Sequence, residues 1–362
     1  MKIGFLSSST GWGGLERNLL RHARWMEELG HETCVFCVQD SKLWSAANET
    51  TRVVIQRHHR YLHWTAGRAL HQLLLTHGVD VLWTRDPRDL GICGQAAMRT
   101  QIPLIFQQGM QLAGPKLMPW HQQRFRRVSR WVSPLHWLQA QVETWTSVPS
   151  ENIQVIPLGL EATWWAPPEQ IMAARSALGW PLERRLVGCF GRLDPLKGQD
   201  VLIRALVHLP TLWEAVFVGD NTVNEDRDML GELKQLARKL GVKNRVHFYP
   251  SMEALRPAYD AVDVLAICSV SETIGMVTLE AMAAGAAVVG TQSGGTPELF
   301  LKGEVDGKAL FQPGDPRALA QCIESGPFRA NRQTLRQHFE ETQVKSQWKA
   351  LLENLPGAHQ KP

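Results

Sequence analysis

The chain has 362 residues, of which 44% are hydrophobic and 20% are charged, a composition typical of an ordinary soluble globular protein. No apolar stretch reaches the roughly 20 residues that a membrane span needs, and no secretory signal peptide is recognisable, so we expect a cytoplasmic protein. The formal net charge of +4 is unevenly distributed, because residues 1–160 hold 17 lysines and arginines against 11 acids.

The first part of the chain alternates short apolar runs with longer amphipathic segments. We predict strands at Lys2–Ser7, Thr33–Val38, Val53–Gln56, Val79–Thr84, Pro103–Phe106, Arg130–Ser133 and Ile153–Pro157. Helices are predicted between them, at Leu15–Leu29, Ala66–His77 and His136–Thr146. Because parallel strands need crossover connections, this alternation predicts a parallel sheet covered by helices.

The pattern breaks at residues 158–184 and then starts again. Strands are predicted at Leu186–Phe190, Ala215–Val218, Val246–Tyr249, Val264–Cys268 and Ala287–Thr291, with helices near Gln199–His208, Arg227–Leu240, Gly275–Ala283, Pro316–Cys322 and Arg329–Leu352. The fold class is therefore α/β with two Rossmann-like domains, at residues 1–160 and 161–345, followed by a helix end and tail at 346–362. Ligands of open α/β sheets bind at the carboxyl ends of the strands, so we expect the site in a cleft that both domains face.

Six cysteines are scattered along the chain, and only Cys34 and Cys37 are close in sequence. They lie in an apolar run and lack further ligands at metal-binding spacing, so we predict buried thiols in a reducing compartment. His58, His59 and His63 also lack acidic or thiol partners nearby, and we predict no metal and no cofactor.

A glycine-rich loop follows the first predicted strand. Residues 8–16 read SSTGWGGLE, and Gly13 and Gly14 would let backbone N–H groups approach a phosphate at the N-terminus of the next helix. A dinucleotide-binding fingerprint needs glycine at the position of Glu16, which disfavours an NAD-dependent dehydrogenase. A tight turn without a ligand is the alternative interpretation.

A second glycine loop, with the sequence FGRLDPLKG at residues 190–198, carries two cations between a predicted strand and a predicted helix. Arg192 and Lys197 could both reach one anion, and together with a helix N-terminus they would offset the charge of a diphosphate without a metal. Solvated surface charges are the alternative interpretation.

Two glutamates follow the strand predicted at Val264–Cys268, in residues 271–280 with the sequence SETIGMVTLE. Glu272 lies on the loop and Glu280 about one turn inside an apolar helix, where a lone acid would be costly without a partner. These carboxylates can accept hydrogen bonds from sugar and ribose hydroxyls, while the N–H groups of Gly275, Met276 and Val277 hold a phosphate between them.

The run SETIGMVTLEAMAAG at residues 271–285 resembles the EX7E motif of glycosyltransferase family 4, which are retaining enzymes of the GT-B fold. Gly191-Arg192 with Lys197-Gly198, Gly13-Gly14 with Glu16, and the GGTPE segment at 294–298 resemble further motifs of that family. The resemblance extends over about residues 2–350 with the motifs in the right order. It implies an acceptor-side domain at 1–160 and a nucleotide-sugar donor domain at 161–345.

The resemblance also implies roles for individual residues. Arg192 and Lys197 would bind the donor diphosphate, Glu272 the transferred sugar and Glu280 the ribose. The nucleobase would lie near Tyr249, Pro250 and Ser251. The family implies a nucleotide-sugar donor, by default a UDP-sugar, and a glycan or lipid-linked acceptor. Synthesis of lipopolysaccharide, exopolysaccharide or another cell-envelope polysaccharide would be the setting, with no nucleic-acid partner.

One departure from the family concerns the end of the fifth predicted strand, where many members carry a histidine close to the donor sugar. This chain has Gln107 or Gln108 there. Glutamine can hydrogen-bond a sugar hydroxyl, although it cannot take up a proton near neutral pH. We therefore treat both glutamines as acceptor-side candidates.

Two further segments have competing interpretations. Asp226-Arg227-Asp228 resembles a metal-binding DxD motif, although acids are also favoured at the start of a helix. Residues 116–137 mix lysine and arginine with tryptophan, which suits an anionic membrane surface on the inner membrane face or a lipid-linked acceptor. A basic helix packed through its aromatic side chains is the alternative for the second segment.

Three functions remain open at this point. A retaining glycosyltransferase leads, and a disaccharide phosphorylase or synthase of the same fold is the alternative among enzymes. A non-catalytic module that binds sugar nucleotides is the alternative outside enzymes, supported by the missing histidine.

Overall fold

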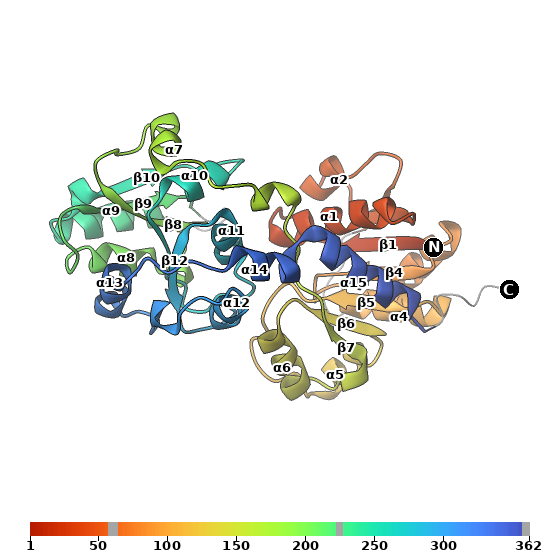
Figure 1. The fold of residues 1–362 in the computed structure, drawn as a ribbon. Helices are drawn as coiled ribbons and strands as arrows, with labels where there is room; N and C mark the ends of the chain where they lie inside the picture. The colour runs from red at the N-terminus through yellow and green to blue at the C-terminus, as the bar shows by residue number, and fades with distance from the viewer. Residues whose placement is uncertain (57–63, 222–226, 357–362) are drawn as a thin grey trace. The chain divides into compact units, whose positions relative to one another are not determined.

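The computed structural model describes residues 1–56, 64–221 and 227–356. The chain forms two compact units (Figure 1). Unit 1 consists of Met1–Leu158 together with Val344–Pro362, and unit 2 consists of Gly159–Gln343.

Unit 1 contains a seven-stranded parallel sheet in the order β3-β2-β1-β4-β5-β6-β7. The strands are β1 (Lys2–Ser7), β2 (Glu32–Val38), β3 (Arg52–Ile55), β4 (Val81–Thr84), β5 (Leu104–Gln107), β6 (Arg130–Ser133) and β7 (Ile153–Val155). All seven correspond to strands that the apolar runs predicted. Their helices are α1 (Gly14–Glu28), α2 (Lys42–Ala46), α3 (Trp64–Thr76), α4 (Leu90–Thr100), α5 (Pro119–Phe125), α6 (His136–Trp145) and α15 (Glu341–Glu353).

Successive side chains of these strands point to opposite faces of the sheet and enter two separate cores. Phe5 packs with residues of α1 and α15, whereas Leu6 packs with residues of α3 and α4. In β2, Phe36 joins the second core and Val35 the first. Burial on both faces explains why the strands are continuously apolar rather than alternating.

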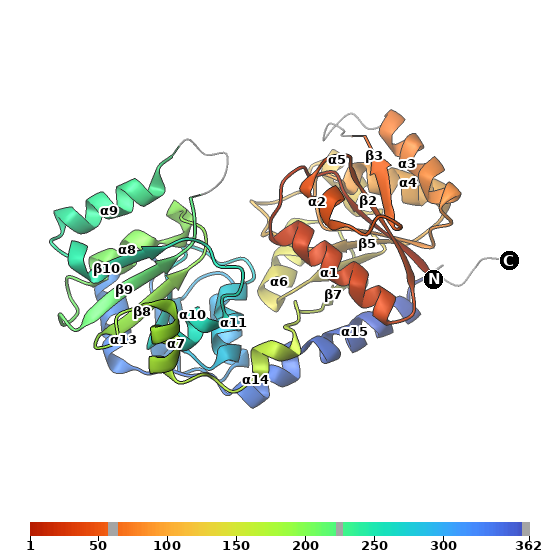
Figure 2. The ribbon, with the colours of Figure 1, turned by 90° about the horizontal axis from the view of Figure 1, so that it is seen from above.

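Unit 2 contains a six-stranded parallel sheet in the order β10-β9-β8-β11-β12-β13. The strands are β8 (Arg185–Phe190), β9 (Trp213–Val218), β10 (Val246–Tyr249), β11 (Val264–Ile267), β12 (Ala287–Thr291) and β13 (Leu310–Phe311). The helices are α7 (Ile171–Leu178), α8 (Gln199–Ala205), α9 (Met229–Lys239), α10 (Arg256–Ala261), α11 (Met276–Ala284), α12 (Thr296–Lys302), α13 (Pro316–Ser325) and α14 (Arg332–Phe339). Side chains of α8, α9 and α13 form one core against the sheet, while α10 packs with α7 and α11 (Figure 2). The prediction of two parallel Rossmann-like sheets is confirmed.

The single helix predicted at Arg329–Leu352 is wrong, because α14 ends at Phe339 and α15 begins at Glu341. Glu340 between them has extended backbone angles. The cause is a backbone contact: the Leu160 N–H donates to the Phe339 carbonyl at 2.7 Å, and the Glu341 N–H donates to the Leu160 carbonyl at 2.9 Å. A chain segment 180 residues away in sequence thus interrupts the helix.

The C-terminal segment, expected to be a helix end and tail, contributes to the core of unit 1. Trp348 is fully buried, and its ring centroid lies 4.2 Å from that of Trp83 in β4. Leu351 and Leu352 join the same core. Truncation before α15 would therefore remove part of a hydrophobic core rather than an appendage.

All six cysteines are buried free thiols, as predicted, and burial raises the pKa of Cys34 and of Cys37 to about 11. His58, His59, His63 and Asp226 lie outside the described residues. Within the described part of the chain, no helix is long and apolar enough to cross a membrane.

His22 is a buried polar residue in α1 that the sequence analysis did not single out. Its ring lies 4.9–5.6 Å, between centroids, from the rings of Trp25, Trp83 and Trp348. Nδ1 lies 2.6 Å from the Asn18 carbonyl, and Nε2 lies 3.0 Å from the Gln107 amide nitrogen. These partners assign the neutral ring a proton on Nδ1. Burial, and then the charge of Arg85, holds the pKa of His22 well below its usual value.

This environment predicts acid destabilisation starting below about pH 6.5. The unfolded chain takes up a proton at His22 near that pH, whereas the folded chain does not, so stability falls as pH drops below the unfolded pKa. One such group lowers the free energy of unfolding by about 1.4 kcal/mol between pH 7.5 and 5.5. Urea unfolding of the wild type and of His22→Gln at both pH values measures this difference. An equal pH dependence in the two proteins would contradict the prediction.

Candidate functional site

The strand order of unit 2 reverses between β8 and β11, where the chain runs outward in both directions across the sheet. Such a switch point leaves a crevice at the carboxyl ends of the two strands, where open α/β sheets bind ligands. The loop after β8 carries Arg192 and Lys197, and the loop after β11 carries Glu272. The residues predicted from the two motifs therefore meet at the position that topology favours.

Lys197 and Glu272 form an ion pair across this switch point, with Nζ 2.8 Å from Oε2. The same Oε2 accepts a hydrogen bond from the Ser269 hydroxyl at 2.9 Å. Among the described residues nothing binds Oε1 of Glu272, so this oxygen remains available to a ligand. Ser269 was not predicted; it is buried and acts by orienting the carboxylate.

Close backbone contacts at two glycines hold the paired loops in place. Gly294 has φ +62°, and a Cβ there would lie 2.2 Å from the Glu272 carbonyl oxygen. The next N–H, of Gly295, donates to that oxygen at 2.8 Å. Gly198 has φ +65°, and its Cβ would lie 2.2 Å from the Cys268 carbonyl oxygen. Glycine is therefore required at both positions by conformation and by space.

Helix α11 begins directly after this loop, with Gly275 at its N-cap in the left-handed conformation, φ +76°. No acceptor among the described residues takes the N–H groups of Gly275, Met276 and Val277. These groups stand at the positive end of the helix, where an anion is favourable.

Glu280 has the partner that the apolar surroundings of its helix required. Its Oε2 accepts a hydrogen bond from the Tyr259 hydroxyl of α10 at 2.8 Å. Tyr259 is buried, and burial together with the neighbouring Glu280 charge raises its pKa well above the usual value. The tyrosine is thus a permanent donor that holds Glu280 in place, and the sequence offered no signal for it.

Arg192 follows Gly191 on the loop after β8, and its side chain is exposed. Its carbonyl accepts a hydrogen bond from the buried Gln199 amide at 2.8 Å. No carboxylate within the described ranges forms an ion pair with its guanidinium. The backbone of Arg192 is thus fixed by a hydrogen bond, while its side chain is exposed and could contact a ligand.

Tyr249 is the last residue of β10, at the edge of the sheet, and Pro250 and Ser251 follow it. The Tyr249 ring stacks on Trp180, with centroids 5.0 Å apart and planes 27° apart. Its carbonyl accepts from the Gly219 N–H at 3.0 Å, and the Ser251 hydroxyl hydrogen-bonds Asp220. Since one face of the tyrosine is covered by Trp180, this segment can offer a ligand mainly its backbone and its exposed proline and serine.

In unit 1 the strand order reverses between β1 and β4, next to the glycine loop. Gly13 is the N-cap of α1, and its N–H donates to the Glu16 carboxylate at 2.9 Å. Glu16, whose presence disfavoured a dinucleotide-binding fingerprint, thus accepts the hydrogen bond of the Gly13 N–H that a phosphate would otherwise accept. Gly14 is exposed, with no atom within 4 Å of where its Cβ would be.

Gln107 is 1% exposed, and both ends of its amide are bonded within the protein. Oε1 accepts from Nη1 of Arg85 at 2.9 Å, and Nε2 donates to His22 at 3.0 Å. Arg85 is itself buried, and burial followed by repulsion from Arg21 lowers its pKa to about 9. Gln107 therefore holds Arg85, which the sequence analysis did not identify.

Gln108 points to the other face of the sheet and is equally buried. Oε1 accepts from the Trp131 ring N–H at 3.2 Å and from the Ser133 hydroxyl at 2.8 Å, while Nε2 donates to the Met110 carbonyl at 3.1 Å. These bonds fix the loop that follows β5.

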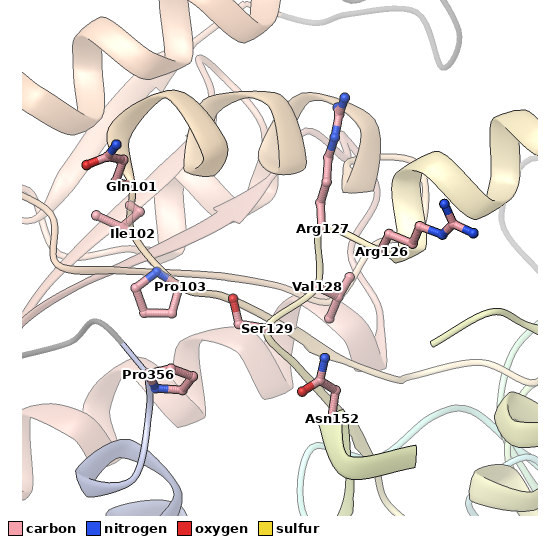
Figure 3. Close-up of a pocket in the computed structure, with 9 residues that line it drawn as sticks. All are labelled: Gln101, Ile102, Pro103, Arg126, Arg127, Val128, Ser129, Asn152 and Pro356. Carbon is pink, nitrogen blue, oxygen red and sulfur yellow. The ribbon is translucent and has the colours of Figure 1, made fainter. Parts of the chain in front are cut away.

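A groove of about 300 Å³ lies at the amino ends of β5 and β6 (Figure 3). It is lined by Gln101, Ile102, Pro103, Arg126, Arg127, Val128, Ser129, Asn152 and Pro356. Amino ends of parallel strands are the edge at which such sheets do not bind their ligands. We therefore place the functional site elsewhere.

No group of histidine, cysteine, aspartate and glutamate that could hold a metal occurs among the residues with described structure. Asp228, from the segment that resembled a DxD motif, is the N-cap of α9 and accepts the Gly231 N–H at 3.0 Å. Asp228 therefore supports the interpretation that this segment is the start of a helix rather than a metal-binding motif.

Gly294→Ala should lower the free energy of unfolding more than Gly241→Ala does. Gly241 is the matched control, since it has φ +72° but no atom within 4 Å of its Cβ position. Left-handed backbone costs about 1–2 kcal/mol at either residue, and the overlap with the Glu272 carbonyl adds to it only at Gly294. Urea unfolding of both variants measures the free energies of unfolding. Equal losses would contradict the backbone contact described above.

Two family models match the chain. The model described as "Glycosyltransferase Family 4" matches residues 12–164, and the one described as "Glycosyl transferases group 1" matches residues 184–325. Together they extend over most of both units.

Solved structures and curated relatives agree with these matches. HepE from Anabaena, in complex with UDP and glucose, superposes with a TM-score of 0.78 and 26% identity, covering 98% of this chain and 100% of that one. WaaB, a lipopolysaccharide outer core galactosyltransferase, superposes with a TM-score of 0.74 at 17% identity, covering 98% and 100%, which supports the fold alone. D-inositol 3-phosphate glycosyltransferase from Xylanimonas cellulosilytica is 36% identical over 180 residues, which are 48% of this chain and 42% of that relative.

The chain thus spans less than half the length of the curated relative that it matches, whereas it covers the whole of HepE. Two parallel Rossmann-like sheets and matches to both family models lead to one conclusion. The chain has the GT-B fold and belongs to glycosyltransferase family 4, within the group 1 glycosyl transferases.

Proposed function

We propose that this chain is a retaining glycosyltransferase that moves a sugar from a nucleotide-sugar donor to a glycan or lipid-linked acceptor. The observation that carries the proposal is the Lys197–Glu272 ion pair, on the loops that precede α8 and α11, with Gly275 as the N-cap of α11. A cation and unbonded N–H groups suit a diphosphate, and a carboxylate suits sugar hydroxyls.

Most of the predicted donor-site residues have a role in this proposal. Arg192, Lys197 and the N–H groups of Gly275, Met276 and Val277 bind the diphosphate and stabilise the charge that develops on it as it leaves. Oε1 of Glu272 accepts a hydrogen bond from the transferred sugar. Glu280, held by Tyr259, accepts from the ribose. Tyr249, Pro250 and Ser251 contact the nucleobase.

The donor is proposed to be a UDP-sugar, and the reaction to need no metal. HepE, which this chain resembles over its whole length, has been solved in complex with UDP-glucose. Two cations and a helix N-terminus supply the positive charge that a divalent ion supplies in other sugar transferases. The setting we propose is synthesis of a cell-envelope polysaccharide or lipopolysaccharide on the cytoplasmic side of the membrane.

Glu272→Gln tests the role of the carboxylate, because it keeps the shape of the side chain and removes its charge. We expect transfer from UDP-glucose to fall by at least about 100-fold, while UDP still stabilises the protein against heat. Glu232→Gln, which removes the acid of an exposed ion pair in the same unit, should leave transfer unchanged. Transfer that survives in Glu272→Gln would refute this role.

The same assay separates the competing functions. Phosphate-dependent release of a sugar from a disaccharide would identify a phosphorylase. UDP binding without transfer from UDP-, GDP- or ADP-glucose in the wild type would support a module that binds sugar nucleotides without catalysis. Retention is read from the anomeric proton of the product by NMR.

We further propose that residues 116–137 of unit 1 bind an anionic membrane surface. The side chains of Leu117, Met118 and Trp120 are 52%, 50% and 53% exposed at the start of α5. Between Asp89 and Glu143 the sequence contains no acidic residue and six basic ones, namely Arg99, Lys116, Arg124, Arg126, Arg127 and Arg130. Exposed apolar side chains beside basic ones are typical of interfacial binding.

Flotation with vesicles that contain anionic lipid tests this surface. The wild type should float with anionic vesicles and remain behind with neutral ones, and the double variant Leu117→Ser/Trp120→Ser should lose most of its binding. Leu301→Ser is the control, since Leu301 is 78% exposed but lies in unit 2. A wild type that does not float with anionic vesicles would remove this proposal.

A further inference from the structure

A small cavity of about 160 Å³ lies at the carboxyl end of β5, beside α5 and entirely within unit 1. Liquid water occupies about 30 Å³ per molecule, so this volume corresponds to roughly five waters, or a phosphate group with a few carbon atoms. Its lining includes the aromatic rings of Phe106, Phe125 and Trp131. Lys116, His121 and Arg124 line it as well.

The aromatic side chains form a packed, rigid wall. Phe106, Phe125 and Trp131 are each at most 2% exposed. The Trp131 ring lies 4.4 Å from Phe106 and 5.5 Å from Phe125, between centroids. The rings make this part of the lining rigid but expose little surface themselves, whereas Met110, which lines the same cavity, is 49% exposed. An apolar group of a ligand can therefore be removed from water here without reorganisation of the lining.

The polar groups of the cavity divide into two kinds. Two neutral glutamines, Gln108 and Gln111, line the cavity. Oε1 of Gln108 accepts from Trp131 and Ser133 and its Nε2 donates to the Met110 carbonyl, and Gln111 also has a partner. Lys116 is different: its backbone N–H is fixed to the Trp145 carbonyl at 2.6 Å, while its ammonium has no acidic partner in the described part of the chain. Recognition in this cavity therefore depends on positive charge.

Arg124 adds a second charge on the same lining. Its guanidinium lies over the Phe125 ring, 5.7 Å from the centroid, and Nη2 lies 3.5 Å from Nδ1 of His121. The imidazole of His121 thus lies beside the guanidinium and lines the cavity together with it. None of the residues that line the cavity is acidic. The lining thus combines two cations and an imidazole with apolar side chains.

We propose that this cavity binds a phosphate ester with a short apolar stem, as the anionic part of the acceptor. The phosphate is held by Lys116 and Arg124, and the stem lies against the apolar part of the lining, which includes Met110. A cation would be repelled here, and a neutral sugar would find no carboxylate to accept from its hydroxyls. The inference deepens the proposed transferase function, since it names the chemical class of the acceptor, but it concerns binding to unit 1 alone.

Isothermal titration of the full chain with hexyl phosphate, inorganic phosphate and 1-hexanol tests the proposal. We expect hexyl phosphate to bind at least 10-fold more tightly than inorganic phosphate, and hexanol to show no measurable binding. Lys116→Gln should weaken hexyl phosphate about 5- to 10-fold, whereas Arg124→Lys, which keeps the charge, should retain most of the affinity.

Arg126→Gln is the matched control. Arg126 is exposed, follows α5 directly and does not line this cavity, so its loss removes the same surface charge without touching the site. Hexyl phosphate that binds Lys116→Gln and the wild type equally would overturn the proposal. So would equal weakening in Lys116→Gln and Arg126→Gln, because the effect would then be that of a diffuse surface charge.

Two sources of the phosphate ester can be distinguished. If hexyl phosphate displaces the wild type from anionic vesicles, the cavity takes the headgroup of a lipid. If hexyl phosphate binds but does not change vesicle binding, or if the wild type does not bind vesicles at all, the cavity takes a soluble phosphorylated acceptor. Titration needs neither donor nor turnover, so a chain that transfers no sugar and still binds hexyl phosphate would refute the transferase function and leave this site intact.

Discussion

The ion pair between Lys197 and Glu272 joins the two loops that leave the central strands of unit 2. A partly buried pair contributes little net stability, because desolvation offsets much of the attraction between the charges. The main effect of the ion pair is to fix the positions of the two side chains. At Gly198 and Gly294 the backbone lies so close to the neighbouring chain segment that no side chain fits. These contacts fix the backbone of the loops that carry Lys197 and Glu272. A diphosphate that approaches Lys197 would meet a cation already oriented by the carboxylate.

Unit 1 places a different kind of polar network at its own switch point. Gln107 accepts from Arg85 and donates to His22, and this requires an acceptor and a donor at opposite ends of one side chain. Glutamine offers both at every pH. A histidine in its place would offer them in one tautomer only, and its protonation would be opposed by the charge of Arg85. Gln107, one of the two glutamines at the place where many members of the family carry a histidine, is thus suited to hold the buried Arg85.

Much of the fold could be predicted, because strands buried on both faces are continuously apolar and helices between them are amphipathic. Glu272 and Lys197 could be predicted because they lie in local motifs. Tyr259 could not, since it sits 21 residues from Glu280 in an ordinary helix and only packing brings them together. The break at Glu340 had no local signal either, because Leu160 causes it from far along the chain. Local chemistry was visible in the sequence, and long-range partners were not.

The two units differ in how their charges are balanced without a ligand. In unit 2 the cation Lys197 is paired with Glu272, so an anionic ligand would have to compete with a carboxylate for it. In unit 1, neither Arg85 nor Lys116 forms an ion pair with an acid among the described residues, and burial lowers the pKa of Arg85. An anion that reaches such a cation gains its attraction without displacing a partner. Other basic residues of unit 1, such as Arg52 and Arg88, are paired with acids, so the uncompensated charge is confined to a few positions. At Lys116 this uncompensated charge supports the proposal that the neighbouring cavity binds a phosphate ester.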